Sequence, residues 1–137
     1  MTRRRLSGAE DSSKKGVLPD ERFGSGRLDP GHLLSAGRQT LLATVTEAVW
    51  REQVVKWAYA RRWLVYWTWS SLHSPRGFPD LILCRPPRLE TVELKTVTGR
   101  LMPDQQIWDD ALSGINFYKH HGVWRPTDED LVLSTLE

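Results

Sequence analysis

The sequence predicts a mixed β-sheet flanked by helices, of α/β or α+β type. Three runs of strand length follow one another at residues 63–69, 82–84 and 91–94, and they are rich in aromatic, aliphatic or β-branched residues. Helical patterns precede the first run and follow the third, and a fourth run comes at residues 122–126. Consecutive strands favour an antiparallel meander, and the helix before the last strand makes a crossover.

Composition separates the start of the chain from the rest of its 137 residues. Residues 1–40 hold six of the ten glycines, few large apolar residues, and eight Lys or Arg against five Asp or Glu. Such a stretch sustains neither a helical nor a strand period. We therefore expect residues 1–43 to be a disordered basic tail and residues 44–137 to be one folded domain. The tail either links and solubilises, or adds phosphate contacts.

A helix is expected over residues 44–62, with Thr44 or Thr46 as its cap. At about 100° per residue, Glu47 lies in line with the apolar positions that pack on the domain. Glu52 lies about 140° away from Glu47 and points to water. The helix dipole favours an acid in the first turn, which explains the acidity of Glu47 but not its inward direction.

The elements after this helix are bounded by turn signals. Residues 70–76 are a polar turn, and its His73 is either solvated or close to the acidic residues that follow. Pro86 and Pro87 separate the second and third strands and argue against a simple two-residue hairpin.

The second half of the domain is predicted to hold two helices and one strand. Pro103 opens a helix at residues 103–113, on which Gln105 begins a stripe that continues inward. This glutamine either bonds a polar group at the end of the sheet or lies on an exposed shoulder. Pro126 ends the fourth strand, and a last short helix follows it to the C-terminus.

Bulk properties exclude several protein classes. One cysteine, Cys84, excludes a disulfide scaffold and a cysteine-built zinc site. No apolar stretch approaches the length of about 20 residues that a membrane span needs, and no secretory signal is seen, so we expect a cytoplasmic protein without a membrane partner. The net charge of +2 is not that of a strongly basic nucleic-acid binder. A local basic surface remains open, with Arg76 and Arg100 as predicted nucleic-acid contacts.

The chemistry concentrates at residues 77–95. Asp80 opens the second strand, and Glu93 and Lys95 lie two residues apart, on the same face, near the end of the third. Glu47 reaches the same place from the first helix. Two hard carboxylates, with the backbone carbonyl of Leu94, suit Mg²⁺ or Mn²⁺, and Glu47 is an open further ligand or holder of a bound water. A metal-activated water attacks phosphodiesters at neutral pH, and a neighbouring lysine orients it or stabilises the developing charge.

In order and spacing, these motifs resemble the VRR-NUC branch of the PD-(D/E)xK nuclease superfamily, including its stand-alone phage and bacterial members. The resemblance covers about residues 44–137. The matching stretches are Thr46-Glu47, Trp63-Leu64-Val65-Tyr66, Gly77-Phe78-Pro79-Asp80-Leu81, Glu93-Leu94-Lys95, Gly99-Arg100-Leu101, Pro103-x-Gln105, Trp108 and Val123-Trp124-Arg125-Pro126.

The resemblance implies a restriction-endonuclease-like core and a Mg²⁺- or Mn²⁺-dependent DNA endonuclease. Small members are similar to Holliday-junction resolvases and act as homodimers, here in a bacterial or phage-infected cell. By the family pattern Asp80 and Glu93 bind metal and Lys95 assists catalysis. Glu47 is then the acid of the first helix, and Gln105 is the glutamine of the second.

Two departures from the family pattern stand out. Many relatives have a histidine on the first strand, where Trp67 aligns, so that any role of the histidine is lost. Residues 114–121 depart from the usual small-residue loop, which bears on substrate fit or dimer contacts.

Other functions stay open beside this one. A catalytically silent nucleic-acid-binding module of the same fold is disfavoured, because a pure binder gains nothing from carboxylates clustered against phosphates. A structural domain with surface ion pairs is a second alternative, which burial of Glu47 beside Asp80 would contradict. Among nucleases, restriction-type, flap-type and nicking enzymes compete with junction resolution. The absence of a recognition domain favours DNA structure over DNA sequence as the feature recognised.

Overall fold

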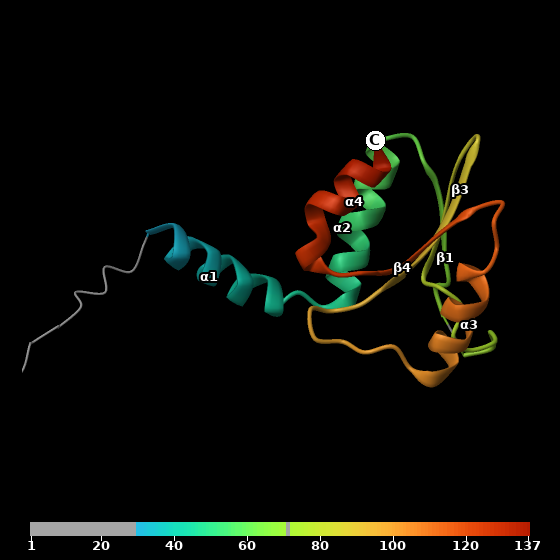
Figure 1. The fold of residues 1–137 in the computed structure, drawn as a ribbon, viewed down its shortest axis with the longest axis horizontal. Coiled ribbons are helices and arrows are strands. Elements are labelled where there is room, and N and C mark those ends of the chain that lie inside the picture. Colours follow the sequence, from blue (N-terminus) through green and yellow to red (C-terminus); the bar gives the residue numbers. More distant parts are fainter. Residues whose placement is uncertain (1–29, 71) are drawn as a thin grey trace, which may run out of the picture.

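The computed structural model describes residues 30–70 and 72–137, whose helices and strands are labelled in Figure 1. In chain order they are α1 (Pro30–Ala43), α2 (Glu47–Ala60), β1 (Leu64–Trp67), β2 (Leu81–Arg85), β3 (Arg88–Leu94), α3 (Pro103–Ser113), β4 (Lys119–Trp124), the 3₁₀ turn η1 (Pro126–Asp128) and α4 (Glu129–Leu136). From α2 onward this order confirms the predicted succession of helix, three strands, helix, strand and helix.

The four strands form one mixed sheet in the order β1-β2-β3-β4. β1, β2 and β3 pair antiparallel as a meander, and β4 returns through α3 to pair parallel with β3. The predicted α/β or α+β fold, a mixed four-stranded sheet flanked by helices, is therefore confirmed and is consistent with a restriction-endonuclease-like core.

The hydrophobic core lies between the sheet and the pair α2 and α4, which pack side by side (Figure 1). Trp50 and Trp63 are buried there, and both indole N–H groups donate to backbone carbonyls, of Trp124 at 3.1 Å and of Leu136 at 2.9 Å. Buried indoles of this kind contribute large apolar area while keeping their polar atom satisfied. The core thus ties α2 to the last strand and the last helix.

The α3 helix is tied to the opposite face of the sheet by polar contacts. Thr91 of β3 faces away from the core, and its hydroxyl lies 2.8 Å from Nδ1 of His120 on β4. The Nε2 atom of the same histidine lies 2.9 Å from the Asp109 carboxylate of α3. Because a carboxylate only accepts hydrogen bonds, Nε2 carries the proton. This chain of bonds fixes α3 against β3 and β4.

The helix α2 ends in a left-handed turn. Arg62 has φ +63°, the one non-glycine residue with positive φ among the described residues. The backbone N–H groups of Arg62 and Trp63 return to the carbonyls of Tyr59 and Ala58 at 3.0 Å each. This is the Schellman pattern, in which glycine usually occupies the left-handed position.

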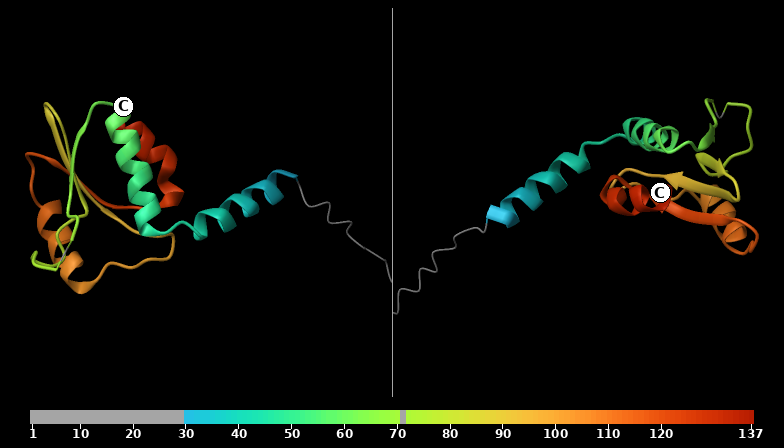
Figure 2. Two further views of the ribbon diagram at one scale, coloured as in Figure 1. Left: turned by 180° about the vertical axis from the view of Figure 1, so that it is seen from behind. Right: turned by 90° about the horizontal axis from the view of Figure 1, so that it is seen from above.

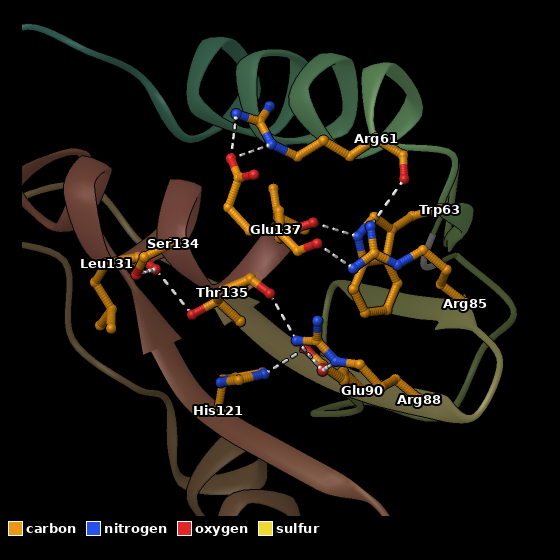
Figure 3. Close-up of polar contacts among 11 residues, drawn as sticks. Arg61, Trp63, Arg85, Arg88, Glu90, His121, Leu131, Ser134, Thr135 and Glu137 are labelled. Atoms are coloured by element: carbon orange, nitrogen blue, oxygen red, sulfur yellow. Dashed lines mark hydrogen bonds and ion pairs between the residues drawn. The ribbon is translucent and has the colours of Figure 1, made fainter.

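A polar network surrounds the opposite end of β3 from Glu93 (Figure 3). Glu90 accepts from the Arg88 guanidinium at 2.6–2.7 Å and from Nε2 of His121 at 2.6 Å. The same Arg88 donates to the Thr135 carbonyl of α4, and Arg85 donates to the carbonyl of Glu137. The guanidinium groups of Arg85 and Arg88 each lie 4.6 Å from the centre of a Trp63 ring. These contacts clamp α4 onto the sheet.

The prediction of a tail up to residue 43 is wrong for residues 30–43, which form α1. Its glycines and serines misled the composition argument, whereas Pro30 suits a first helical position. Contacts with the domain support the helix: Arg38 pairs with Glu129 at 3.1 Å, and Leu42 lines a groove with Val45 of the following turn. The rest of α1 projects away from the sheet (Figures 1 and 2). The predictions for residues 1–29 lie outside the described residues, and the domain division stays a prediction.

Two local predictions are also corrected. The last strand begins at Lys119 rather than Gly122, because parallel pairing with β3 extends to the register Glu90–Lys119. The prolines do not prevent a two-residue hairpin, since Arg85 and Arg88 pair directly across Pro86 and Pro87. The peptide bond between these two prolines is cis, the arrangement of a turn that accepts proline at its third position.

No helix of the described residues has both the length and the apolar character that crossing a membrane requires.

Candidate active site

Asp80 is positioned by the segment that joins β1 to β2. Gly77 has φ +91°, and a Cβ atom there would lie 2.3 Å from the backbone carbonyl oxygen of Asp104, so only glycine fits. The next residue, Phe78, packs edge-on against Trp108 of α3 with ring centres 4.9 Å apart. The approach to Asp80 is therefore fixed on the first turns of α3.

The carboxylate of Asp80 points across the sheet to the end of β3. Its Oδ2 atom accepts the backbone N–H of Leu94 at 2.8 Å. This bond fixes the side chain beside the last residues of β3. The sequence expectation that Asp80 and the end of the third strand meet at one edge of the sheet agrees with this geometry.

Glu93 is held between two donors on the α3 side of the sheet. Its Oε1 atom accepts from Nε2 of Gln105 at 2.5 Å and from Nζ of Lys95 at 3.0 Å. The glutamine is itself oriented, because its Oε1 accepts the N–H of Met102 at 2.9 Å. Gln105 is therefore no exposed shoulder residue. It fixes the rotamer of Glu93, the first of the two possibilities open from the sequence.

Lys95 is buried, with 7% of its surface exposed. Its backbone N–H donates to the Trp124 carbonyl at 3.1 Å, and this carbonyl also accepts the indole N–H of Trp50. Its ammonium lies 3.0 Å from Glu93 and 3.8 Å from Oε2 of Glu47. Glu47 stands at the first position of α2, whose N-cap Thr46 accepts the N–H of Val49. The predicted cap at Thr46 is thus confirmed.

The electrostatics of this group are unbalanced. Burial, the nearby Asp80 carboxylate and Glu47 raise the pKa of Glu93 to about 7, although Lys95 opposes the shift. Partial burial also raises the pKa of Glu47, again against the effect of Lys95 and with Asp80 contributing. One ammonium therefore faces three carboxylates, and it does not neutralise them.

The donor set fits a hard divalent cation. Asp80 and Glu93 supply carboxylate oxygens close enough for each to disfavour the charge of the other, and a cation between them would remove that repulsion. Across residues 30–70 and 72–137, no three His, Cys, Asp or Glu side chains already stand in metal-binding geometry. A site built on these two carboxylates would be completed by a backbone carbonyl and waters, as Mg²⁺ sites commonly are.

The structure brings together Glu47, Asp80, Glu93, Lys95 and Gln105, whereas no contact joins the two predicted DNA-contacting arginines to this cluster in the described residues. Arg76 and Arg100 are exposed on different loops, before β2 and before α3. Trp67 packs against the hydrophobic core, which agrees with an apolar residue at that position of β1. The carbonyl of Leu94 as a metal ligand and the catalytic roles of all five side chains stay predictions.

Sequence reasoning missed the residue that shapes the loop after Lys95. Nη1 of Arg125 donates to the carbonyls of Thr96 at 2.5 Å and Gly99 at 2.7 Å. One guanidinium thus holds together the loop that runs from Lys95 to α3. The signal was present, since an arginine between a buried strand and a proline has few ways to be satisfied, but its partners lie 26–29 residues away.

The geometry argues against a domain whose acids only form surface ion pairs. Glu93 and Lys95 are buried, and Glu47 is partly buried beside them. Surface pairs contribute little and leave pKa values near normal, whereas this cluster keeps a carboxylate far from its ordinary value.

Comparison with known proteins bears on this cluster. The model of the VRR-NUC domain family matches residues 40–124, well over half of the chain, and includes all five side chains. The chain matches no curated protein and no solved structure. A match to this family implies a nuclease-type domain with DNA binding, and nuclease families of this kind typically use divalent metals. The chain belongs to the VRR-NUC domain family.

Proposed function

We propose that this protein is a divalent-metal-dependent DNA endonuclease whose active site is the cluster of Glu47, Asp80, Glu93, Lys95 and Gln105. One observation carries the proposal: Glu93 is buried at the end of β3 with its pKa raised to about 7 by burial and by Asp80. A bound cation would relieve this repulsion between carboxylates, and pKa values shifted in this way are typical of functional sites.

Asp80 and Glu93 are the residues that would hold Mg²⁺ or Mn²⁺, with the Leu94 carbonyl completing the set. When bound, the ion supplies charge stabilisation for the phosphoryl oxygens and a water of lowered pKa. The bond from the Leu94 N–H to Asp80 and the bond from Gln105 to Glu93 hold both carboxylates in place before any ion binds. Preorganisation of this kind favours a hard cation that tolerates little ligand movement.

In the proposed reaction Lys95 acts on the phosphodiester and the attacking water. Its ammonium, 3.0 Å from Glu93, stabilises negative charge that grows on a phosphodiester oxygen and orients the attacking water. Glu47 pairs with the same ammonium at 3.8 Å and is a candidate for a further ligand or for holding a bound water. Gln105 acts through Glu93 and is a positioning residue.

The finer substrate proposal is a structured DNA such as a Holliday junction, cut by a homodimer. The family resemblance supports it, and a two-fold dimer places two sites on two strands. Leu64 and Tyr66 of the edge strand β1 expose apolar surface that a partner copy can cover. Restriction-type and flap-type cleavage are the competing outcomes.

The test is cleavage of labelled DNAs by the purified protein with Mg²⁺, Mn²⁺ or EDTA. The panel holds a four-way junction, a flap, a continuous duplex and a single strand, and each is also given to Asp80→Asn. We expect cleavage that disappears with EDTA and falls at least about 100-fold in the variant. Paired symmetric nicks in the junction, with a dimer in sedimentation analysis, would establish the finer proposal.

Glu52→Gln is the matched control, because this acid also lies on α2 but is exposed. It should cut like the wild type. Tight binding of DNA without cleavage under either metal would replace the nuclease by a binding module. Cleavage that survives in Asp80→Asn would remove this cluster as the active site.

A further inference from the structure

Trp69 differs from the other six tryptophans, all of which lie in the described part of the chain. Its side chain is 90% exposed, whereas the others are buried or half-buried. Leu72, three residues further on, is 85% exposed. A single exposed apolar residue needs no explanation. For Trp69, three features point to a ligand: its place in the fold, the charges near it in the sequence, and the anchoring of its segment.

The place of Trp69 is the edge of the sheet that carries the active site. Trp67, the last residue of β1, pairs with Leu81, the residue after Asp80. Chain geometry therefore limits the Cα atoms of Trp69 and Asp80 to a separation of about 17 Å or less. That distance corresponds to about five base steps of DNA. An indole here reaches DNA whose scissile phosphate lies at Asp80.

The charge environment of Trp69 differs from that of the catalytic cluster. Between Thr68 and Pro79 the sequence contains Arg76 and His73 and no acidic residue. An exposed arginine suits a phosphate, and an exposed indole offers a flat apolar face. Exposed aromatic rings together with cations on one segment are the combination that binds unpaired nucleobases by stacking, without regard to sequence.

The segment is anchored where it returns to the sheet. Gly77 rests against the Asp104 backbone, Phe78 packs on Trp108, and Pro79 is buried. These contacts join its end to α3, the helix that carries Gln105. The start of the segment is fixed by β1, whose last residue, Trp67, lies two positions before Trp69 and pairs with Leu81.

We propose that Trp69 stacks on an unpaired nucleobase of the DNA substrate, close to the phosphate cut at Asp80 and Glu93. The proposal rests on the proposed nuclease function and narrows its substrate to DNA with unpaired or opened bases near the cut. Leu72 is the second apolar contact, and Arg76 holds the adjoining phosphate. Continuous duplex, whose bases are stacked on each other, offers Trp69 no open face.

The test measures binding without turnover. In an Asp80→Asn background with Mg²⁺, the affinity for a gapped duplex and for a continuous duplex of the same sequence is measured by anisotropy. A 2-aminopurine in the gap reports stacking by its fluorescence. We expect Trp69→Ala to weaken binding of gapped DNA about 5- to 150-fold and to restore the 2-aminopurine fluorescence. Continuous duplex should change less than about twofold.

Two further variants sharpen the result. Trp69→Phe keeps a stacking ring and should retain most of the affinity for gapped DNA. Phe117→Ala is the matched control, because this side chain is 86% exposed but precedes β4, at the opposite edge of the sheet. It should change neither affinity. Because Trp69 and Phe117 are exposed, both alanine variants should keep the thermal stability of the parent.

The outcomes separate this inference from the function on which it rests. Wild-type protein that cuts DNA, with Trp69→Ala binding both DNAs as before, overturns the inference and leaves the nuclease. A Trp69→Ala variant that turns from dimer to monomer and loses both DNAs equally assigns the indole to a partner copy, which also overturns it. Wild-type protein that neither binds nor cuts any DNA overturns both.

Discussion

The pKa values of two buried glutamates on one strand are shifted in opposite directions. Glu90 is 3% exposed and Glu93 is 4% exposed, and both belong to β3, three residues apart. Burial raises the pKa of Glu90, but its bonds with His121 and Arg88 outweigh burial, so that its pKa is lowered. Burial and the Asp80 charge raise the pKa of Glu93 to about 7, and Lys95 does not compensate.

The difference lies in the partners and not in the depth of burial. Around Glu90 a guanidinium and an imidazole N–H satisfy both carboxylate oxygens, and the same arginine closes on α4 (Figure 3). Around Glu93 the single ammonium is shared with Glu47 while Asp80 adds negative charge. One end of β3 is thus neutral and closed, and the other is left with excess negative charge. A buried carboxylate with a structural role is paired with positive groups of the protein itself, whereas carboxylates that bind a cation are left without full pairing until the cation is bound.

The contrast between Glu90 and Glu93 should have its largest effect on DNA cleavage. Glu93→Gln should lower DNA cleavage about 10²- to 10³-fold, because it removes a charge that the reaction needs, while Glu90→Gln should lower it less than about threefold. Single-turnover rates under saturating Mg²⁺ measure both. Equal losses in the two variants would erase the distinction between the two ends of the strand.

The pH dependence of stability should separate the same residues. The pKa of Glu93 is raised from 4.5 to about 7, so its contribution to stability is present below about pH 4.5 and is lost as pH rises through 7. In EDTA, wild-type protein should therefore lose on the order of 3 kcal/mol relative to Glu93→Gln between pH 4.5 and pH 8. Urea unfolding at several pH values measures it. The lowered pKa of Glu90 makes its contribution present above pH 4.5 and lost only in more acidic solution. A difference between wild type and Glu93→Gln that stays constant with pH would contradict the unbalanced cluster.

Breaking the network of Glu90, Arg88 and His121 should lower the stability of the fold. Glu90→Ala leaves Arg88 and His121 without their acceptor and should lower the free energy of unfolding by about 2–3 kcal/mol. Glu52→Ala, which removes an exposed carboxylate, should change it by less than about 0.5 kcal/mol. Urea unfolding at pH 7 compares the two, and similar values would show that the network does not stabilise the fold.

The smallest expected effect is at the end of α2, near the closed network. Arg62→Gly should raise stability by up to about 1 kcal/mol, since φ +63° is strained for arginine and not for glycine. DNA cleavage should be unchanged, because Arg62 lies at the far end of α2 from Glu47. A lower melting temperature in scanning calorimetry would mean that the arginine side chain makes contacts outweighing the strain.

Patterns close together in the sequence predicted much of the fold and the site. The alternation that places Glu93 and Lys95 on one face, the inward direction of Glu47, and the helix opened by Pro103 are all local regularities. The features that the sequence did not predict depend on contacts between residues far apart in the chain. The bonds of Arg125 to the Thr96 loop, the contact of Gly77 with Asp104, and the early start of β4 exist only once remote segments meet. The helix α1 was missed because composition outweighed its leucines.

The bond from the Lys95 N–H to the Trp124 carbonyl has a consequence for how the protein is made. It fixes the backbone of Lys95 to β4, which follows β3 in the chain only after α3 has been made. The parallel pairing of β3 with β4 is therefore a late contact, because loop closure over a helix must precede it. A growing or half-folded chain has its acids but not its assembled site. In the proposed nuclease, the ability to cut DNA therefore arises only with the finished fold.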